Sequence, residues 1–108
     1  MSLRPRLDQA AKLAAVALTP GAYAAARAGK PFSLSAFRLV TQIRARVGAV
    51  RVVLDAGANK GQFSRAAATA FPGARLIAFE PLEAVAAEWR ANLADVAGAE
   101  VHACALDA

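Results

Sequence analysis

The fold is decided by the stretch Val50-Arg51-Val52-Val53-Leu54-Asp55-Ala56-Gly57-Ala58-Asn59-Lys60-Gly61-Gln62-Phe63. Its apolar run predicts a buried strand over residues 50–54, which a tight glycine turn connects to a helix that begins near Gly61. A turn in this position directs free backbone N–H groups and a helix N-terminus into the crevice where α/β folds bind nucleotide-like ligands. Asp55 adds a carboxylate at the same end of the strand.

The elements that follow predict a parallel sheet. The helix extends over residues 61–70 and is stopped by Phe71-Pro72-Gly73, and a second strand covers residues 75–79. Pro81 opens a helix that runs to about Leu93, and a third strand covers residues 100–106. Strands that alternate with helices at this spacing form right-handed crossover units, so the fold class is α/β.

Two helices are predicted before the first strand. Residues 7–18 form a weakly amphipathic helix with Leu18 on its apolar face, which favours a packing or leader helix over a membrane-surface helix because most of that face is alanine. Residues 34–47 form a stronger helix that begins after Ser33 and ends at Gly48. Its apolar stripe consists of Leu34, Phe37, Val40, Ile43 and Val47. We therefore divide the chain into an N-terminal helical or leader segment, residues 1–32, and an α/β unit, residues 33–108.

Composition narrows the class of protein. A chain of 108 residues that is 57% hydrophobic can form one small domain with a core, which excludes disorder. Residues 1–51 carry nine Lys or Arg and one acid, whereas residues 52–108 carry four Lys or Arg and seven acids. The arginines of the basic half are scattered and lack interleaved aromatic residues, so we expect a solvated surface and no nucleic-acid partner.

Single residues add further expectations. Cys104 is the only cysteine, so no intramolecular disulfide forms, and no Cys/His grouping has the spacing of metal ligands. This composition fits a cytoplasmic protein, and no apolar run is long enough to span a bilayer. Trp89 falls on the apolar stripe of its helix, with Leu82, Val85 and Leu93, and is predicted to be core. His102 and Cys104 are predicted to share one face of the third strand and to pack there.

The glycine pattern fails two common phosphate-binding motifs. A dinucleotide fingerprint that starts at Gly57 requires glycine where the chain has Asn59 and Gln62, and the Gly-Lys-Ser/Thr of a P-loop is absent. What remains is Asp55-x-Gly57-x-Asn59-x-Gly61-x-Phe63, with a second acid, Glu80, at the end of the second strand. A strand-end acid in that position accepts hydrogen bonds from ribose hydroxyls. The two carboxylates suit a ligand that has a cationic amino-acid part and a ribose.

Each of these residues also has a structural explanation. The glycines could serve only to reverse the chain, Asp55 could be a helix cap, and Glu80 could be a solvated acid before a helix. We favour ligand binding because these independent causes would otherwise have to coincide.

The same residues resemble a known family, the FkbM-type S-adenosylmethionine-dependent methyltransferases. The resemblance covers roughly residues 37–108. It depends on Val53-Leu54-Asp55-Ala56-Gly57-Ala58-Asn59-Lys60-Gly61-Gln62-Phe63-Ser64, on Ile77-Ala78-Phe79-Glu80-Pro81, on Asn92 and on Val101 to Asp107. It implies a Rossmann-like parallel sheet of the class I methyltransferase type, with only the first three strands present and N-terminal helices in front.

The resemblance also implies a role for each candidate residue. Asp55 lies near the methionine amino group, Glu80 binds the ribose hydroxyls, and Asp107 contacts the adenine. Gly57 and Gly61 let the backbone approach the cofactor, while Asn59 shapes the turn. No residue is singled out as a catalytic base.

In the related fold the sheet has seven strands, and this chain reaches about the third. We therefore expect a truncated chain: the donor-binding half of a methyltransferase whose acceptor is a small molecule or a sugar, with no acceptor site. The strand over residues 50–54 is then an apolar edge that the missing C-terminal half or another chain covers, and the chain alone is marginally stable.

Two other classes stay open. One is a nicotinamide-dependent oxidoreductase fragment, which would share Glu80 and the fold. The other is a non-catalytic interaction or regulatory fragment that uses the basic front half of the chain.

Overall fold

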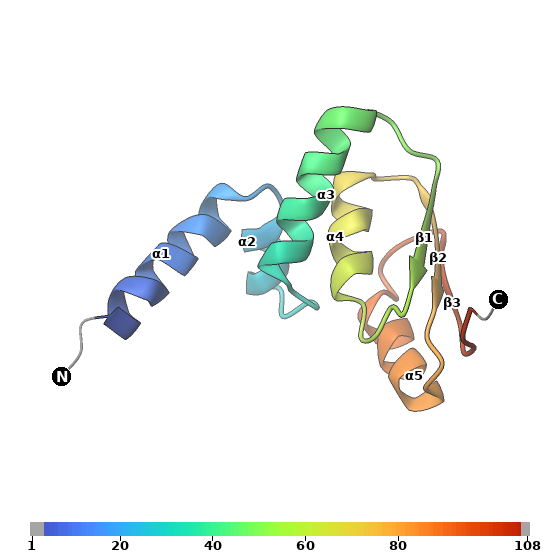
Figure 1. Ribbon diagram of the computed structural model, residues 1–108. Coiled ribbons are helices and arrows are strands. Elements are labelled where there is room, and N and C mark those ends of the chain that lie inside the picture. The colour runs from blue at the N-terminus through green and yellow to red at the C-terminus, as the bar shows by residue number, and fades with distance from the viewer. Residues whose placement is uncertain (1–3, 107–108) are drawn as a thin grey trace.

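A parallel three-stranded sheet forms the centre of the computed structural model, which describes residues 4–106 (Figure 1). The strands are β1 (Val52–Ala56), β2 (Arg75–Phe79) and β3 (Ala99–His102), in the order β1-β2-β3. Both pairs are parallel, with Val52 opposite Arg75 and Leu76 opposite Ala99. The predicted α/β arrangement, a parallel sheet preceded by helices, is confirmed.

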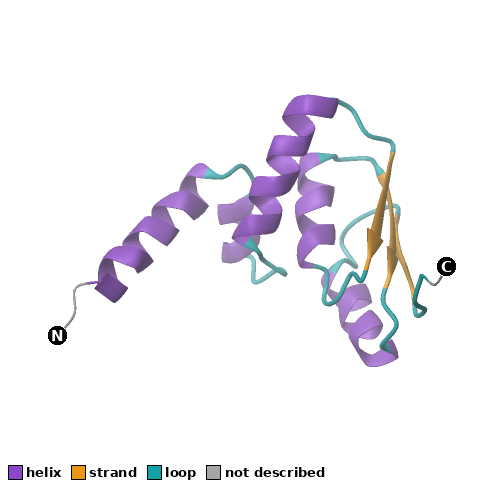
Figure 2. Cartoon of the chain, viewed as in Figure 1, coloured by secondary structure: helices purple, strands orange, loops and turns teal. Residues whose placement is uncertain are grey.

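Five helices lie on one side of this sheet in the part of the chain that the structure describes (Figures 1 and 2). They are α1 (Arg4–Leu18), α2 (Ala22–Arg27), α3 (Leu34–Val47), α4 (Gln62–Ala70) and α5 (Glu83–Asn92). Helix α4 packs on β1 and β2, α5 packs on β3, and α3 packs on α4. The structure is therefore a sheet with one helical face and one bare face.

Helix α3 has the predicted bounds because both of its ends carry strong signals. The Ser33 hydroxyl accepts a hydrogen bond from the N–H of Ala36 at 3.3 Å, which satisfies one free donor of the first turn. Gly48 follows the last turn with φ 69°, a conformation that favours glycine. Phe37 and Val40 are buried, but Val47, the last residue of the predicted stripe, is exposed.

Three predicted boundaries need correction. Strand β1 covers 52–56 instead of 50–54, because Asp55 and Ala56 continue the pairing with β2. Helix α5 begins at Glu83 instead of Pro81, because Leu82 is an extended N-cap residue. Strand β3 ends at His102 instead of residue 106, since the chain bends there and the Cys104 N–H returns to the His102 carbonyl at 2.9 Å.

The core lies between the sheet and the helices. Trp89 on α5 is 1% exposed, so its predicted core position is confirmed, and Leu93 beside it is also buried. Leu82 was predicted to share that apolar face but is exposed, because it precedes the helix. Phe37, Val40 and Leu76 are the other large side chains in the same cluster.

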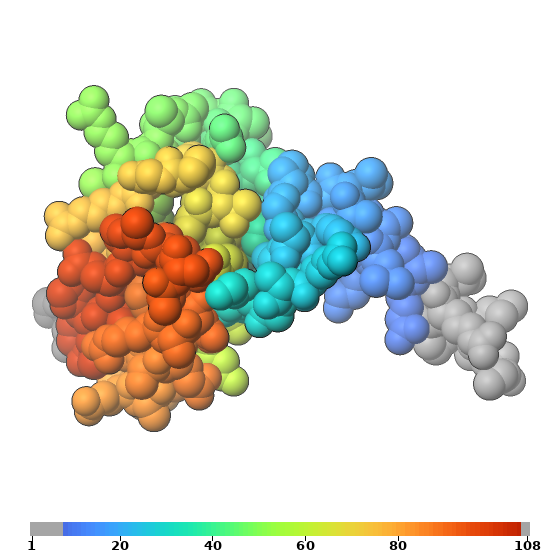
Figure 3. All heavy atoms as spheres, turned by 180° about the vertical axis from the view of Figure 1, so that it is seen from behind, coloured from blue at the N-terminus to red at the C-terminus, as the bar shows by residue number. Residues whose placement is uncertain are grey.

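The N-terminal segment joins this core through few side chains. Val16 of α1 and Ala22 and Ala25 of α2 belong to the same buried cluster as Trp89, whereas Leu13 and Leu18 of α1 are 70% and 84% exposed. Leu18 therefore does not lie on a packed face as predicted. Helix α1 projects from the rest of the molecule (Figures 1 and 3), and the radius of gyration is 15.0 Å, against about 13 Å for a compact chain of this length. No helix in residues 4–106 is long and apolar enough to cross a membrane.

The bare face of the sheet carries exposed apolar side chains. Val52 and Leu54 of β1 are 51% and 64% exposed, and Phe79 of β2 stacks on His102 with ring centroids 5.5 Å apart. Strand β1 has a neighbour on one side only among the described residues, as predicted.

His102 and Cys104 differ from their prediction. Both side chains are exposed, and Cys104 lies beyond the end of β3. His102 Nε2 lies 3.3 Å from Glu100 Oε2 on the bare face. Neither residue packs in the core, because β3 is too short to include Cys104 and its outward side chains have no helix against them.

Candidate functional site

Asp55 lies in a buried chain of hydrogen bonds beneath the glycine turn. Its side chain points from β1 toward α4, where the Ser64 hydroxyl donates to Asp55 Oδ2 at 2.5 Å. The indole Nε1–H of Trp89 in turn donates to the Ser64 Oγ at 2.9 Å. Ser64 and Trp89 are almost fully buried, and Asp55 is 7% exposed. Ser64 of α4, itself bonded to Trp89 of α5, thus fixes the position of the carboxylate.

Burial raises the pKa of Asp55 above its usual value, and the hydrogen bond from Ser64 opposes this shift only in part. Between the ordinary pKa of about 3.8 and the raised value, the folded state binds more protons than the unfolded state. The free energy of unfolding therefore falls as the pH rises through this window. At neutral pH the buried carboxylate destabilises the fold.

We expect Asp55→Asn to be at least as stable as the wild type at pH 7, because the amide removes the buried charge and its oxygen still accepts from Ser64. The advantage should shrink as the pH falls toward 4. Urea denaturation at the two pH values measures both quantities, with the exposed Asp8→Asn as the control for loss of one acid. A variant that unfolds at lower urea than the wild type at pH 7 would contradict the assignment.

The backbone N–H groups of the turn are already bonded within the protein. Gly57 and Ala58 both donate to the Phe79 carbonyl, at 2.8 and 3.0 Å, and Gly61 donates to the Ala58 carbonyl at 3.1 Å. The expectation that the turn directs free N–H groups into the crevice is wrong for these three residues. The cause is that Ala56 pairs with Phe79 at the end of the β1–β2 ladder, which brings the Phe79 carbonyl to the N–H groups of Gly57 and Ala58.

Glu80, the residue that follows β2, bonds to the glycine turn. The N–H of Asn59 donates to Glu80 Oε1 at 3.0 Å, and the N–H of Leu82 donates to Oε2 at 2.9 Å. The side chain is 7% exposed and links the glycine turn to the loop before α5. It is not a solvated acid. Each carboxylate oxygen keeps a second lone pair for a further donor.

Three residues of the turn adopt left-handed backbone conformations: Gly57 at φ 70°, Asn59 at φ 51° and Gly61 at φ 105°. A Cβ on Gly61 would collide with Leu93 Cδ2 and would lie 3.3 Å from Trp89 Cδ1. A Cβ on Gly57 would meet no atom within 4 Å. Gly61 is thus needed for close packing against α5, whereas Gly57 faces open space.

Helix α5 and the segment after it hold the turn in place. Asn92 Nδ2 donates to the Lys60 carbonyl at 3.0 Å. Arg65 of α4 donates to the Asn92 carbonyl at 2.6 Å and to both oxygens of Asp95, at 3.1 and 2.6 Å. The guanidinium lowers the pKa of Asp95.

The structure therefore brings five of the six predicted site residues to one turn: Asp55, Gly57, Asn59, Gly61 and Glu80. Asp107 lies outside the described residues. Sequence reasoning did not include Ser64 or the indole N–H of Trp89 in the site. Ser64 follows Asp55 by nine residues, which places it in the first turn of the next helix, and that spacing is the signal that was available.

Comparison of the chain with family models, with curated protein sequences and with solved structures finds no match. Its function is therefore inferred from the geometry of the turn.

Proposed function

We propose that the chain binds S-adenosylmethionine and forms the donor-binding part of a methyltransferase of the FkbM type. The observation that carries this proposal is the pair of buried carboxylates, Asp55 and Glu80, at adjacent strand ends beside a turn whose N–H groups are mostly occupied. Such a site offers acceptors and few donors. It fits a ligand with a cationic group and sugar hydroxyls.

Asp55 would bind the amino group of the methionine part. Its carboxylate is buried at a cost to stability that the hydrogen bond from Ser64 offsets only in part, and carboxylates with a raised pKa cluster at functional sites. A ligand ammonium beside it would supply the opposite charge and lower its pKa again.

Glu80 would accept hydrogen bonds from the ribose hydroxyls. Its two oxygens are oriented by the backbone N–H groups of Asn59 and Leu82, so the free lone pairs have fixed directions. A carboxylate that is oriented before binding loses less entropy when the ligand arrives.

The alternative of a dinucleotide is less well supported. A dinucleotide fold directs N–H groups of its glycine turn at a diphosphate. Here Gly57, Ala58 and Gly61 donate to carbonyls, and Asn59 donates to Glu80. Two carboxylates nearby would also repel a diphosphate.

When bound, S-adenosylmethionine would supply a methyl group on a positively charged sulfur: the acceptor would form a bond to the methyl carbon in line, and the carbon–sulfur bond would break to leave the thioether S-adenosylhomocysteine. The task of this chain in that reaction is to position the donor. Asp55 and Glu80 would fix the two ends of the cofactor, and the packing of Gly61 against α5 would keep the turn between them rigid. An oxygen of a small molecule or a sugar is the acceptor that we propose.

Titration calorimetry with S-adenosylhomocysteine tests the proposal. Glu80→Ala should weaken binding by about 10- to 100-fold, the range expected for losing hydrogen bonds to a charged group. Glu83→Ala removes the same charge from an exposed position three residues later and should leave the affinity unchanged. Glu80→Ala also removes the bonds to the N–H groups of Asn59 and Leu82 and could disturb the turn itself. Glu80→Gln keeps one acceptor oxygen, so comparing the two variants separates the effect of lost ligand contacts from the effect of a disturbed turn.

NAD, titrated in parallel, should bind more weakly than S-adenosylhomocysteine. Tighter binding of NAD, or equal affinities of the wild type and Glu80→Ala for S-adenosylhomocysteine, would overturn the assignment.

A further inference from the structure

Two hollows meet along helix α1, away from Asp55 and Glu80. One has a volume of about 450 Å³ and lies between α1 and α2, where Leu13, Val16, Ala26 and Phe32 line it. The other has a volume of about 600 Å³ and lies over the first turns of α3. Lys12 and Phe32 line both hollows, so the two adjoin. Both volumes fall in the range of small-molecule sites, roughly 300–1,000 Å³.

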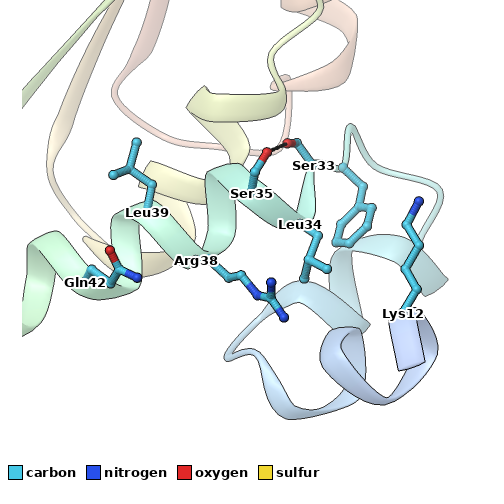
Figure 4. Close-up of a pocket in the computed structure, with 8 residues that line it drawn as sticks. Lys12, Ser33, Leu34, Ser35, Arg38, Leu39 and Gln42 are labelled. Carbon is cyan, nitrogen blue, oxygen red and sulfur yellow. Dashed lines mark hydrogen bonds between the residues drawn. The ribbon is translucent and has the colours of Figure 1, made fainter. Parts of the chain in front are cut away.

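The hollow over α3 is cationic. Lys12 comes from α1 and Arg38 from α3, and both residues line it, with Leu34 between them in the view of Figure 4. Within residues 4–106 neither cation forms an ion pair, and no acidic residue lines either hollow. The hydroxyls of Ser33 and Ser35 lie 3.0 Å apart at its rim. The first turn of α3 contains no acid, so it adds positive potential.

The hollow between α1 and α2 is mainly apolar. Among its lining residues Val16 is buried, Phe32 is partly buried and Leu13 is 70% exposed. Gln9 and the stem of Lys12 complete the lining. A lysine can lay its methylene chain along an apolar surface and keep its ammonium at the rim.

We propose that these adjoining hollows bind a single-chain anionic amphiphile, with its hydrocarbon chain between α1 and α2 and its phosphate or carboxylate head in the cationic hollow over α3. The charge of the lining selects the head, because Lys12 and Arg38 give this hollow a positive potential that attracts an anion and repels a cation. Burial of the chain covers Leu13 and the exposed part of Phe32. This site shares no residue with the candidate cofactor site, so the two can be tested separately.

The test uses the full chain and alkyl phosphates of increasing length, from butyl to dodecyl, each below its critical micelle concentration. Amide chemical shifts report where the probe binds, and the residues between Phe32 and Ser35 and around Leu13 and Val16 should shift. Affinity should rise by as much as about fourfold for each methylene that becomes buried. Inorganic phosphate alone should bind more weakly than every alkyl phosphate.

Charge variants test the position of the head. Arg38→Gln should weaken dodecyl phosphate binding about three- to fivefold, and the double variant with Lys12→Gln about tenfold. Arg46→Gln removes the same charge from the exposed end of α3 outside the hollow and should have less than about a twofold effect. Dodecyltrimethylammonium should not compete.

Several results would overturn the proposal. They are equal affinities of phosphate and dodecyl phosphate, equal effects of the Arg38 and Arg46 variants, and binding that is seen only with micelles or anionic vesicles. The last result would assign this surface to a membrane instead of a single molecule.

Discussion

Gly61→Ala is expected to destabilise the fold by about 2–5 kcal/mol, the largest effect of any single methyl group in the site. Two causes add. The backbone of Gly61 has φ 105°, which a side chain strains, and the new methyl group would collide with Leu93 and press on Trp89. Urea denaturation followed by far-ultraviolet circular dichroism measures the loss.

Gly57→Ala is the matched control, because Gly57 also has a positive φ but faces open space. Its loss should be only about 1–2 kcal/mol, from backbone strain alone. Leu93 is buried, so Leu93→Ala is itself destabilising, but it should cost less in the Gly61→Ala background than in the wild type, since it removes the atoms that collide. Equal losses for the two glycine variants would mean that packing against α5 does not constrain the turn.

Trp89→Ala is expected to cost about 3–5 kcal/mol, as large aromatic residues do when they are truncated in a core. Trp89→Phe keeps most of the ring and removes the N–H that donates to Ser64, so it should cost about 1–3 kcal/mol. Circular dichroism is again the suitable measurement, because both variants lack the only tryptophan.

Trp89→Phe has a second consequence for Asp55. Ser64 loses the donor that polarises it, so its bond to Asp55 weakens and the pKa of Asp55 should rise further. The losses from Trp89→Phe and Ser64→Ala should therefore not be additive. Additive losses would show that Trp89 contributes by burial alone.

Much of the fold could be predicted because its local signals agree. Ser33 and Gly48 fix both ends of α3, and Phe71-Pro72-Gly73 separates α4 from β2. Helix α2 was not predicted, because its six residues are mostly alanine and carry no periodic pattern. The end of β3 depends on where its pairing with β2 stops, and a single strand does not encode that limit.

The residues of the site were predictable, but their bonds were not. Spacing alone placed Asp55 and Glu80 at neighbouring strand ends. It could not reveal that Phe79 accepts the N–H groups of Gly57 and Ala58, which depends on the register of β1 against β2. It also could not reveal that Ser64 and Trp89 bond to one another, since they meet only after α4 and α5 pack on the sheet.

Because one face of the sheet is bare and the other packs against helices, substitutions at alternating positions of β1 have different consequences. Val52 and Leu54 are exposed to solvent, whereas Val53 and Asp55, which alternate with them along the strand, face the helices. A polar residue at position 52 or 54 removes no contact with α4 and leaves the bond between Asp55 and Ser64 intact. Solubility and the ligand binding that we propose can therefore be engineered independently, at alternating positions of β1.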